Sequence, residues 1–201
     1  LYDHFPGLLS AALVNSIVQA VYVYAASFHG KKLLALGGNS GNPIFDWFIG
    51  RELNPRIGEF DIKTFNELRP GLILWALLDI SCVCHQYTKF GWVSDSIVLV
   101  TLFHVWYIVD SLINESTILT QMDITTDGFG FMLSVGDLAW LPFTYCLQAR
   151  FLAFHPIHLG WLGVLAILAV QFTGYYIFRV ANLEKNEFRH GRNPKGTYAM
   201  R

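Results

Sequence analysis

The sequence predicts an all-α protein, a polytopic transmembrane helical bundle with about five spans and an ordered cytosolic loop. Three observations support this fold class. Hydrophobic residues make up 53% of the 201 residues and charged residues only 14%, whereas a typical soluble domain has about 25% charged residues. Apolar stretches long enough to cross a bilayer recur along the chain. Lysine and arginine also gather on one side of the resulting topology.

The first predicted span is 8–28, and a polar loop follows it at 30–69. The span is apolar over about the 20 residues that a bilayer requires. The loop contains too much Gly, Asn and Pro to form a span, and too many aromatic residues to be a disordered linker. We therefore expect an ordered cytosolic loop with short helices that lie on the membrane surface.

Four further spans are predicted at 70–86, 96–113, 129–150 and 158–178, followed by a basic tail at 179–201. Arg69-Pro70-Gly71 supplies the start signal of the second span. Gly136, Asp137 and Pro142 interrupt the span at 129–150, where we expect a break or kink. We treat 1–201 as a single membrane domain.

The distribution of basic residues supports five crossings. With this number of spans, the loop at 30–69, the loop after the third span and the tail share one side. That side holds twelve of the 14 Lys and Arg residues, and only Lys89 and Arg150 fall on the other. Because basic loops stay in the cytosol, we place the first side there.

The third span has a polar arc. At about 100° per residue, one arc holds Thr101, His104, Tyr107, Ser111, Asn114 and Glu115, with Asp110 at its border. Val98, Leu102, Val105, Val109, Leu112 and Ile113 fall opposite and can face acyl chains. Ionisable residues inside a membrane indicate a functional site, while an ordinary helix seam joined by polar contacts is the alternative.

Metal and nucleic-acid binding receive little support from the sequence. The histidines and cysteines lack the spacing of a metal site, so we predict none. A formal net charge of −1 argues neither for nor against nucleic acid by itself, and we expect no such partner.

The segment 41–56, GNPIFDWFIGRELNPR, resembles the first signature of the sterol reductase family. Every fixed position of that signature is matched, by Gly41, Phe45, Asp46, Phe48, Gly50, Leu53, Asn54, Pro55 and Arg56. The stretches 65–71, 122–131 and 185–189 extend the likeness. ELRPG together with MDITTDGFGFML is similar to the delta-14 reductases of the family, particularly fungal ones, and to the enzymatic part of the lamin B receptor.

The resemblance implies a multi-pass enzyme of the endoplasmic reticulum membrane that uses NADPH to saturate the delta-14 double bond of sterol intermediates. Its partners would be the sterol substrate, the lipid bilayer and other membrane enzymes of the pathway. The family's second signature, beginning H-R-x-x-R-D, is absent here, so we expect a fragment of a larger reductase. The alternatives are a non-enzymatic anchor or sterol-binding protein of lamin B receptor type, and a sibling reductase for another double bond.

Reduction of an isolated alkene by NADPH requires an acid, because hydride does not add to an electron-rich double bond. A buried carboxyl group can have a raised pKa and donate a proton. We assign catalysis to Tyr107 and Glu115, without deciding which one donates. The sterol pocket is assigned to His104, Asp110, Asn114, Asp123 and Asp127, although Asp123 and Asp127 suit loop and helix capping equally well.

Two further assignments concern the basic and polar residues. Lys185 and Arg189 are spaced i and i+4, so in a helix they share a face that suits a phosphate. The resemblance implies that they bind the NADPH ribose phosphate; by spacing alone, a basic flank attracted to anionic lipid is favoured. Asp46, Asn54 and Arg56 are expected to form an internal hydrogen-bond set within the loop at 30–69.

Overall fold

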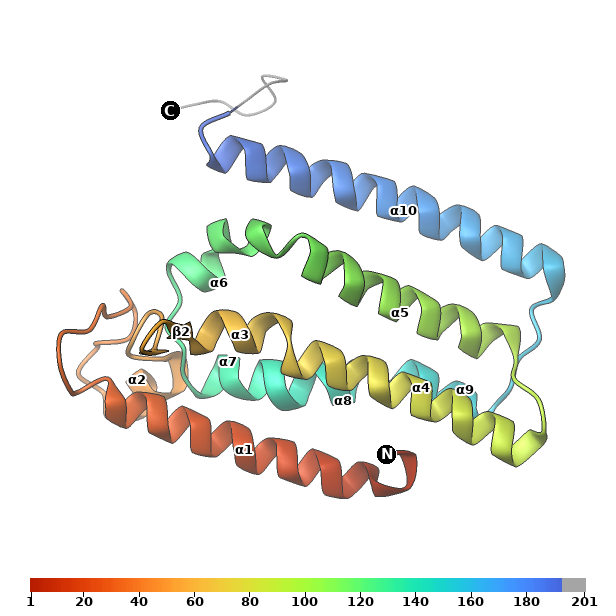
Figure 1. Cartoon of the computed structure of the whole chain (residues 1–201), viewed down its shortest axis with the longest axis horizontal. Helices are drawn as coiled ribbons and strands as arrows, with labels where there is room; N and C mark the ends of the chain where they lie inside the picture. Colours follow the sequence, from red (N-terminus) through yellow and green to blue (C-terminus); the bar gives the residue numbers. More distant parts are fainter. Residues whose placement is uncertain (193–201) are drawn as a thin grey trace. The chain divides into compact units, whose positions relative to one another are not determined.

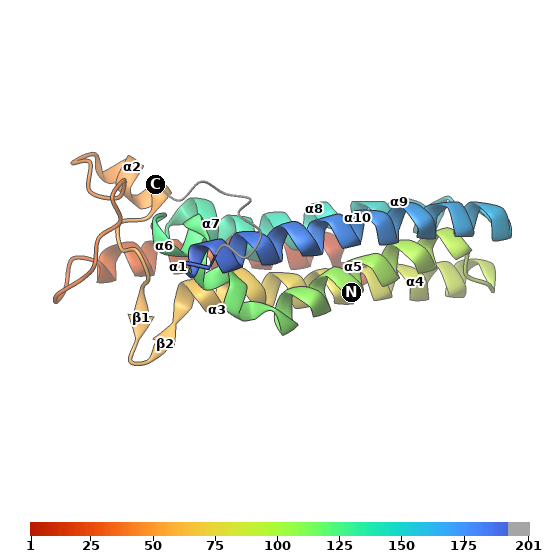
Figure 2. The same ribbon diagram turned by 90° about the horizontal axis from the view of Figure 1, so that it is seen from above.

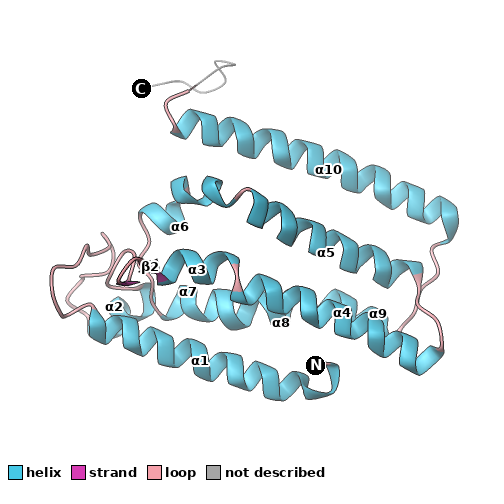
Figure 3. Cartoon of the chain, viewed as in Figure 1, coloured by secondary structure: helices cyan, strands magenta, loops and turns pink. Residues whose placement is uncertain are grey.

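The computed structural model describes residues 1–192, and the chain divides into two compact units, Leu1–Ile157 and His158–Arg201. Helices dominate both units, which confirms the all-α fold class (Figure 3). The described helices of the first unit are η1 (Tyr2–His4), α1 (Phe5–Ala26), α2 (Pro43–Ile49), α3 (Ile62–Leu68), α4 (Pro70–Phe90), α5 (Asp95–Ile113), η2 (Glu115–Thr120), α6 (Met122–Thr125), α7 (Phe131–Val135), η3 (Gly136–Trp140), α8 (Leu141–Tyr145) and α9 (Leu147–Phe154). The hairpin β1 (Arg56–Ile57) and β2 (Phe60–Asp61) belongs to the same unit, and α10 (Gly160–Arg189) forms the second.

Four helical stretches of residues 1–192 are long and apolar enough to cross a membrane. They are Tyr2–Ala26, Ile62–Phe90, Asp95–Ile113 and Gly160–Arg189. These stretches correspond to the first, second, third and fifth predicted spans. The chain is therefore a multi-pass membrane protein by the length and composition of its helices.

The predicted fourth span, 129–150, is built from short segments. α7, η3, α8 and α9 follow one another, and η3 is a π-helical turn at Gly136–Trp140. Pro142 in the first turn of α8 has no backbone N–H to continue the α-helical ladder, which explains the expected break at this place. Each segment is too short to count as a span alone, so the fifth crossing stays a prediction.

The loop at 30–69 contains two short helices with capped N-termini, α2 and α3. Asn42 caps α2 by accepting from the backbone N–H groups of Ile44 and Phe45. Asp61 caps α3 in the same way, and α3 then leads directly into α4 (Figure 1). Helices α3 and α4 together form the stretch Ile62–Phe90, and the location of the short helices on the membrane surface stays a prediction.

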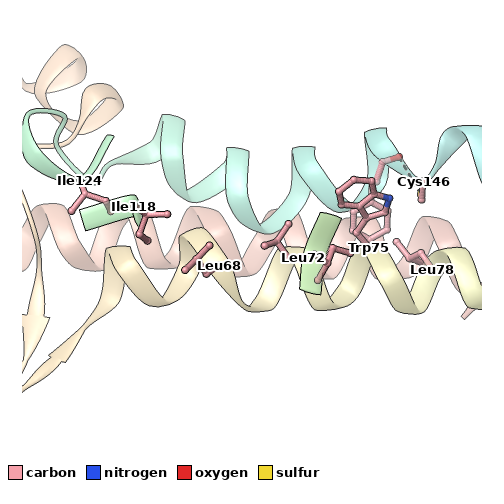
Figure 4. Packing of buried hydrophobic residues seen from close by; sticks show 9 residues of the cluster. Leu68, Leu72, Trp75, Leu78, Ile118, Ile124 and Cys146 are labelled. Atoms are coloured by element: carbon pink, nitrogen blue, oxygen red, sulfur yellow. Dashed lines mark hydrogen bonds between the residues drawn. The ribbon is translucent and has the colours of Figure 1, made fainter. Parts of the chain in front are cut away.

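Helix α4 lies at the centre of the first unit. It packs against α5, α8 and α9, and successive long segments run in alternating directions in Figure 1. Gly71 lets the start of α4 lie directly against η3, because a Cβ atom at this position would collide with the carbonyl oxygen of Asp137. Figure 4 shows the apolar core along this helix, whose buried members are Leu68, Leu72, Trp75, Leu78, Ile108, Ile118, Ile124, Phe143 and Cys146.

The loop at 30–69 and α6 lie at one end of the first unit's long helices, and the turn between α4 and α5 lies at the other (Figure 1). Figure 2 shows the hairpin β1–β2 projecting from this end, beside the start of α3 and on the side opposite α2. In the second unit, α10 runs to Arg189, so the first part of the predicted tail at 179–201 is helical. Lys195 and Arg201, which contribute to the basic tail, lie outside the described residues.

Candidate active site

The polar arc of α5 lies partly against α4. His104 Nδ1 is 2.6 Å from Asp79 Oδ2 of α4, and Asp79 is 0% exposed. The ring of Trp75 on α4 lies 4.5 Å from the His104 ring, centroid to centroid. The opposite arc is solvent-accessible in the isolated chain at Leu102, Val109 and Ile113. This arrangement is the one expected of a helix with one face to protein and one to lipid.

Tyr107 lies one turn further along the same arc. Its ring is 6.0 Å from Trp75, and Tyr107 is 47% exposed. Trp75 also contacts Tyr145, at 5.3 Å between ring centroids. A phenol that is partly accessible and held against an indole can reach a ligand, which a buried phenol cannot.

Asp110 and Asn114 occur together at the end of α5. Asn114 Nδ2 donates to the Asp110 carboxylate at 3.2 Å and to its backbone carbonyl at 2.8 Å. Two members of the predicted sterol pocket thus orient each other. They lie beyond Tyr107 on the helix, toward η2.

Glu115 does not have the raised pKa that a proton donor requires. Arg69 Nη1 and Nη2 donate to the two carboxylate oxygens at 2.8 and 2.7 Å, a bidentate geometry. These hydrogen bonds lower the pKa of Glu115 below its ordinary value. Glu115 is thus held in an ion pair with Arg69, and its assignment to catalysis stays a prediction.

Asp123 and Asp127 lie at a different polar cluster, around Lys63. Lys63 is 0% exposed, and its Nζ donates to the backbone carbonyls of Leu53 and Asp127. Glu67 and Asp123 are within electrostatic range of this ammonium group. Since a buried charge is retained only when it is paired, Lys63 holds the loop at 30–69 against the segment that follows α6.

The loop's own polar residues do not form the single set that was expected. Asp46 accepts from the backbone N–H and the hydroxyl of Ser40 at 2.8 and 2.7 Å, which lowers its pKa. Arg56 instead pairs with Asp61 across the hairpin at 3.0 Å. Among the described residues, Asn54 Oδ1 is buried without a hydrogen-bond partner. Asp46 and Arg56 are therefore anchored separately.

The two glycine-bearing stretches of the chain meet backbone to backbone. Gly50, with a φ of 101°, lies against Gly128 and Gly130, and a Cβ atom on any of the three would collide with the backbone opposite. The N–H of Phe129 donates to the carbonyl of Glu52 at 3.0 Å. GRELNPR and TTDGFGF thus form one structural unit, although they are far apart in sequence.

Lys185 and Arg189 both lie in the last turns of α10. Their spacing places them on one face of this helix, as the sequence predicts. Arg192, just beyond α10, is paired with Glu187 at 2.6 Å.

Sequence reasoning missed Asp79, Trp75 and Lys63. Asp79 carried a signal, because an ionisable residue inside a predicted span is itself a mark of function. Trp75 and Lys63 carried none, since an indole in a span and a lysine near its start are ordinary features of membrane helices.

The family model of the ergosterol biosynthesis ERG4/ERG24 family matches residues 1–200. The chain belongs to this family. That result confirms the resemblance seen in residues 41–56, and it extends over nearly the whole chain.

Three similar curated relatives are delta(14)-sterol reductases of fungi. The delta(14)-sterol reductase erg24 of Schizosaccharomyces pombe is 62% identical over 194 residues, which cover 96% of this chain and 46% of the relative. The delta(14)-sterol reductase ERG24 of Saccharomyces cerevisiae is 53% identical over 203 residues, with the same two coverages of 96% and 46%. The delta(14)-sterol reductase of Ascobolus immersus is 55% identical over 195 residues, covering 94% of the chain and 45% of the relative. The chain thus spans less than half the length of these relatives.

Proposed function

We propose that this chain is part of an NADPH-dependent reductase of the endoplasmic reticulum membrane, which saturates the delta-14 double bond of sterol intermediates in ergosterol-type biosynthesis. The observation that carries the proposal is the identity to delta(14)-sterol reductases, 62% over 96% of the chain for the fission yeast relative. The multi-pass architecture agrees with a substrate that dissolves in the bilayer.

The reaction requires a proton and a hydride on the two carbons of the double bond. NADPH, when bound, supplies the hydride. Tyr107 is the proton donor in this proposal, because Glu115 is ionised and paired with Arg69. The Tyr107 O–H bond breaks as a C–H bond forms on the less substituted carbon, and the tertiary carbocation that results accepts the hydride.

The remaining residues of the polar arc have binding roles in this proposal. His104, Asp110 and Asn114 line the sterol pocket beside Tyr107, and fixed negative charge there stabilises the carbocation. Asp123 and Asp127 border the pocket through the segment that Lys63 holds. On α10, Lys185 and Arg189 hold the ribose phosphate of the cofactor, because two cations on one helix face match a dianion.

The proposal is tested by turnover. The chain is assayed alone and as a chimera that carries the remaining length of the fission yeast relative, with NADPH and a delta-14 sterol. We expect turnover by the chimera, and a fall in kcat of at least about 100-fold in Tyr107→Phe because its proton donor is lost.

The matched control is Tyr87→Phe, since Tyr87 is an exposed tyrosine of α4. Sterol binding without reduction by a folded chimera would instead support a non-enzymatic role. Full activity of Tyr107→Phe would remove this residue as the donor.

Cofactor recognition is tested by substitutions on α10. Lys185→Ala and Arg189→Ala should each raise the Kd of NADPH roughly tenfold or more, because a hydrogen bond between charged groups is lost. The Kd of NADH, which lacks this ribose phosphate, should change little. Arg192→Ala is the matched control, as its guanidinium is already paired with Glu187. Equal losses for both nucleotides would contradict phosphate recognition.

A further inference from the structure

Asp79 and His104 form a pair between α4 and α5. The pair joins Asp79 Oδ2 to His104 Nδ1 at 2.6 Å, and Asp79 Oδ1 has no hydrogen-bond partner among the described residues. Asp79 is 0% exposed, whereas the side chain of His104 is 17% exposed. A carboxylate is costly to keep in an apolar helix, and a simple helix seam does not require one.

The hydrogen bond to Asp79 sets the tautomer and the orientation of the His104 ring. A carboxylate that accepts at Nδ1 holds the ring in a form that carries hydrogen on Nδ1, and it fixes the orientation of Nε2. Because Asp79 is fully enclosed and His104 is not, only the histidine has a side open to exchange. Among the described residues, the thiols of Cys82 and Cys146 are also in electrostatic contact with Asp79.

His104 is also a neighbour of Tyr107. The two residues are i and i+3 on α5, so their Cβ atoms lie about 5–6 Å apart on one helix face. Both rings contact Trp75. The indole thus holds the phenol and the imidazole on the same side of α5.

We propose that Asp79 is a positioning residue, which holds His104 so that its Nε2 returns a proton to Tyr107 after each reduction. This role rests on the proposed function. Transfer of the hydroxyl proton to the sterol leaves Tyr107 as a phenolate. The imidazolium of His104 then breaks its Nε2–H bond and the phenol O–H bond re-forms. Water supplies the next proton to the imidazole, whose Nδ1 stays in contact with the Asp79 carboxylate.

The test uses the chimera that turns over sterol. In Asp79→Asn, we expect kcat to fall at least about tenfold because return of the proton becomes slow, while the KM for the sterol is unchanged since Asp79 does not touch it. The solvent deuterium isotope effect on kcat should rise. A loss of helix packing alone would reduce the amount of folded enzyme without raising the isotope effect.

Two controls on α4 separate chemistry from folding. Ser81→Ala removes a hydroxyl that donates to the carbonyl of Leu78 in its own helix, and the kinetics of this variant should match those of the unchanged enzyme. Gln86→Leu removes a buried polar side chain that donates to Leu152 and accepts from Ser94. This variant should lower the folded amount but leave kcat per folded enzyme unaltered.

A double variant keeps the test decisive if Asp79→Asn does not fold. Asp79→Leu with His104→Leu replaces both partners by apolar groups, a change that is often nearly neutral for stability. We expect a folded protein with a lowered kcat. A wild-type kcat and isotope effect in either folded variant would overturn the inference and leave the proposed function intact. Absence of turnover in the unchanged chimera would overturn both.

Discussion

A single partner decides what the Glu115 carboxyl group can do. Burial without a partner raises the pKa of a carboxyl group. Arg69, which is 46 residues away in sequence, reverses this by binding both oxygens. Glu115 therefore anchors the start of η2 to the start of α4.

This ion pair should make stability depend on pH. The pKa of Glu115 is lowered in the folded chain, so its contribution is complete above the unfolded pKa of about 4.3 and is lost as the pH falls through the folded pKa. The side chains of Arg69 and Glu115 are 35% and 36% exposed, so we expect the ion pair to contribute at most about 1 kcal/mol to the free energy of unfolding. Unfolding of Glu115→Gln and of the unchanged chain is compared from pH 7 to pH 3.

In that comparison, the difference in the free energy of unfolding between Glu115→Gln and the unchanged chain should shrink toward low pH. Glu59→Gln is the control, because Glu59 lies exposed in the turn of the hairpin. The ion pair would have no measurable effect on stability if Glu115→Gln and Glu59→Gln gave the same pH profile.

At the scale of elements, a backbone contact joins two distant motifs. The segment after α2 and the segment before α7 approach so closely that only glycine fits at Gly50, Gly128 and Gly130. The hydrogen bond from Phe129 to Glu52 and the ammonium group of Lys63 close the same junction. Contacts between main-chain atoms therefore fix these two segments against each other, together with the side chain of Lys63.

Gly50→Ala should destabilise the chain by about 2 kcal/mol or more, because the new methyl group meets backbone and the φ of 101° is strained for alanine. Thermal unfolding in detergent measures the effect. Gly58→Ala is the matched control, since Gly58 also has a positive φ of 62° but has nothing within 4 Å of the added Cβ. Equal effects of the two substitutions would argue against the backbone contact.

For the whole molecule, the open question is the crossing at Phe131–Phe154. Ser116 and His155 are exposed residues on either side of these segments. In a variant without the native cysteines, Ser116→Cys and His155→Cys should react with a membrane-impermeant maleimide from opposite faces of sealed vesicles. Labelling of both cysteines from the same face would show that these segments do not cross the membrane. The basic loops would then no longer lie on one side as predicted.

Much of the fold was accessible from the sequence because its determinants are local. Apolar length located the long helices, and Pro142 with Gly136 predicted the interruption at η3. The pairing of helices was not accessible, since it depends on register between distant segments. The Asp79–His104 contact and the Arg69–Glu115 pair both belong to this class. The site residues and the cofactor face on α10 stay predictions.

The short turn between α4 and α5 gives the Asp79–His104 pair a consequence for insertion of the chain into the membrane. The two helices are consecutive and joined by a short turn, and their polar groups satisfy each other at 2.6 Å. A lone helix carrying Asp79 would expose its carboxyl group to acyl chains, at a cost of about 2.5–3.5 kcal/mol near the bilayer centre. During translation, α4 is therefore better suited to leave the insertion channel together with α5, as a helical hairpin, than alone.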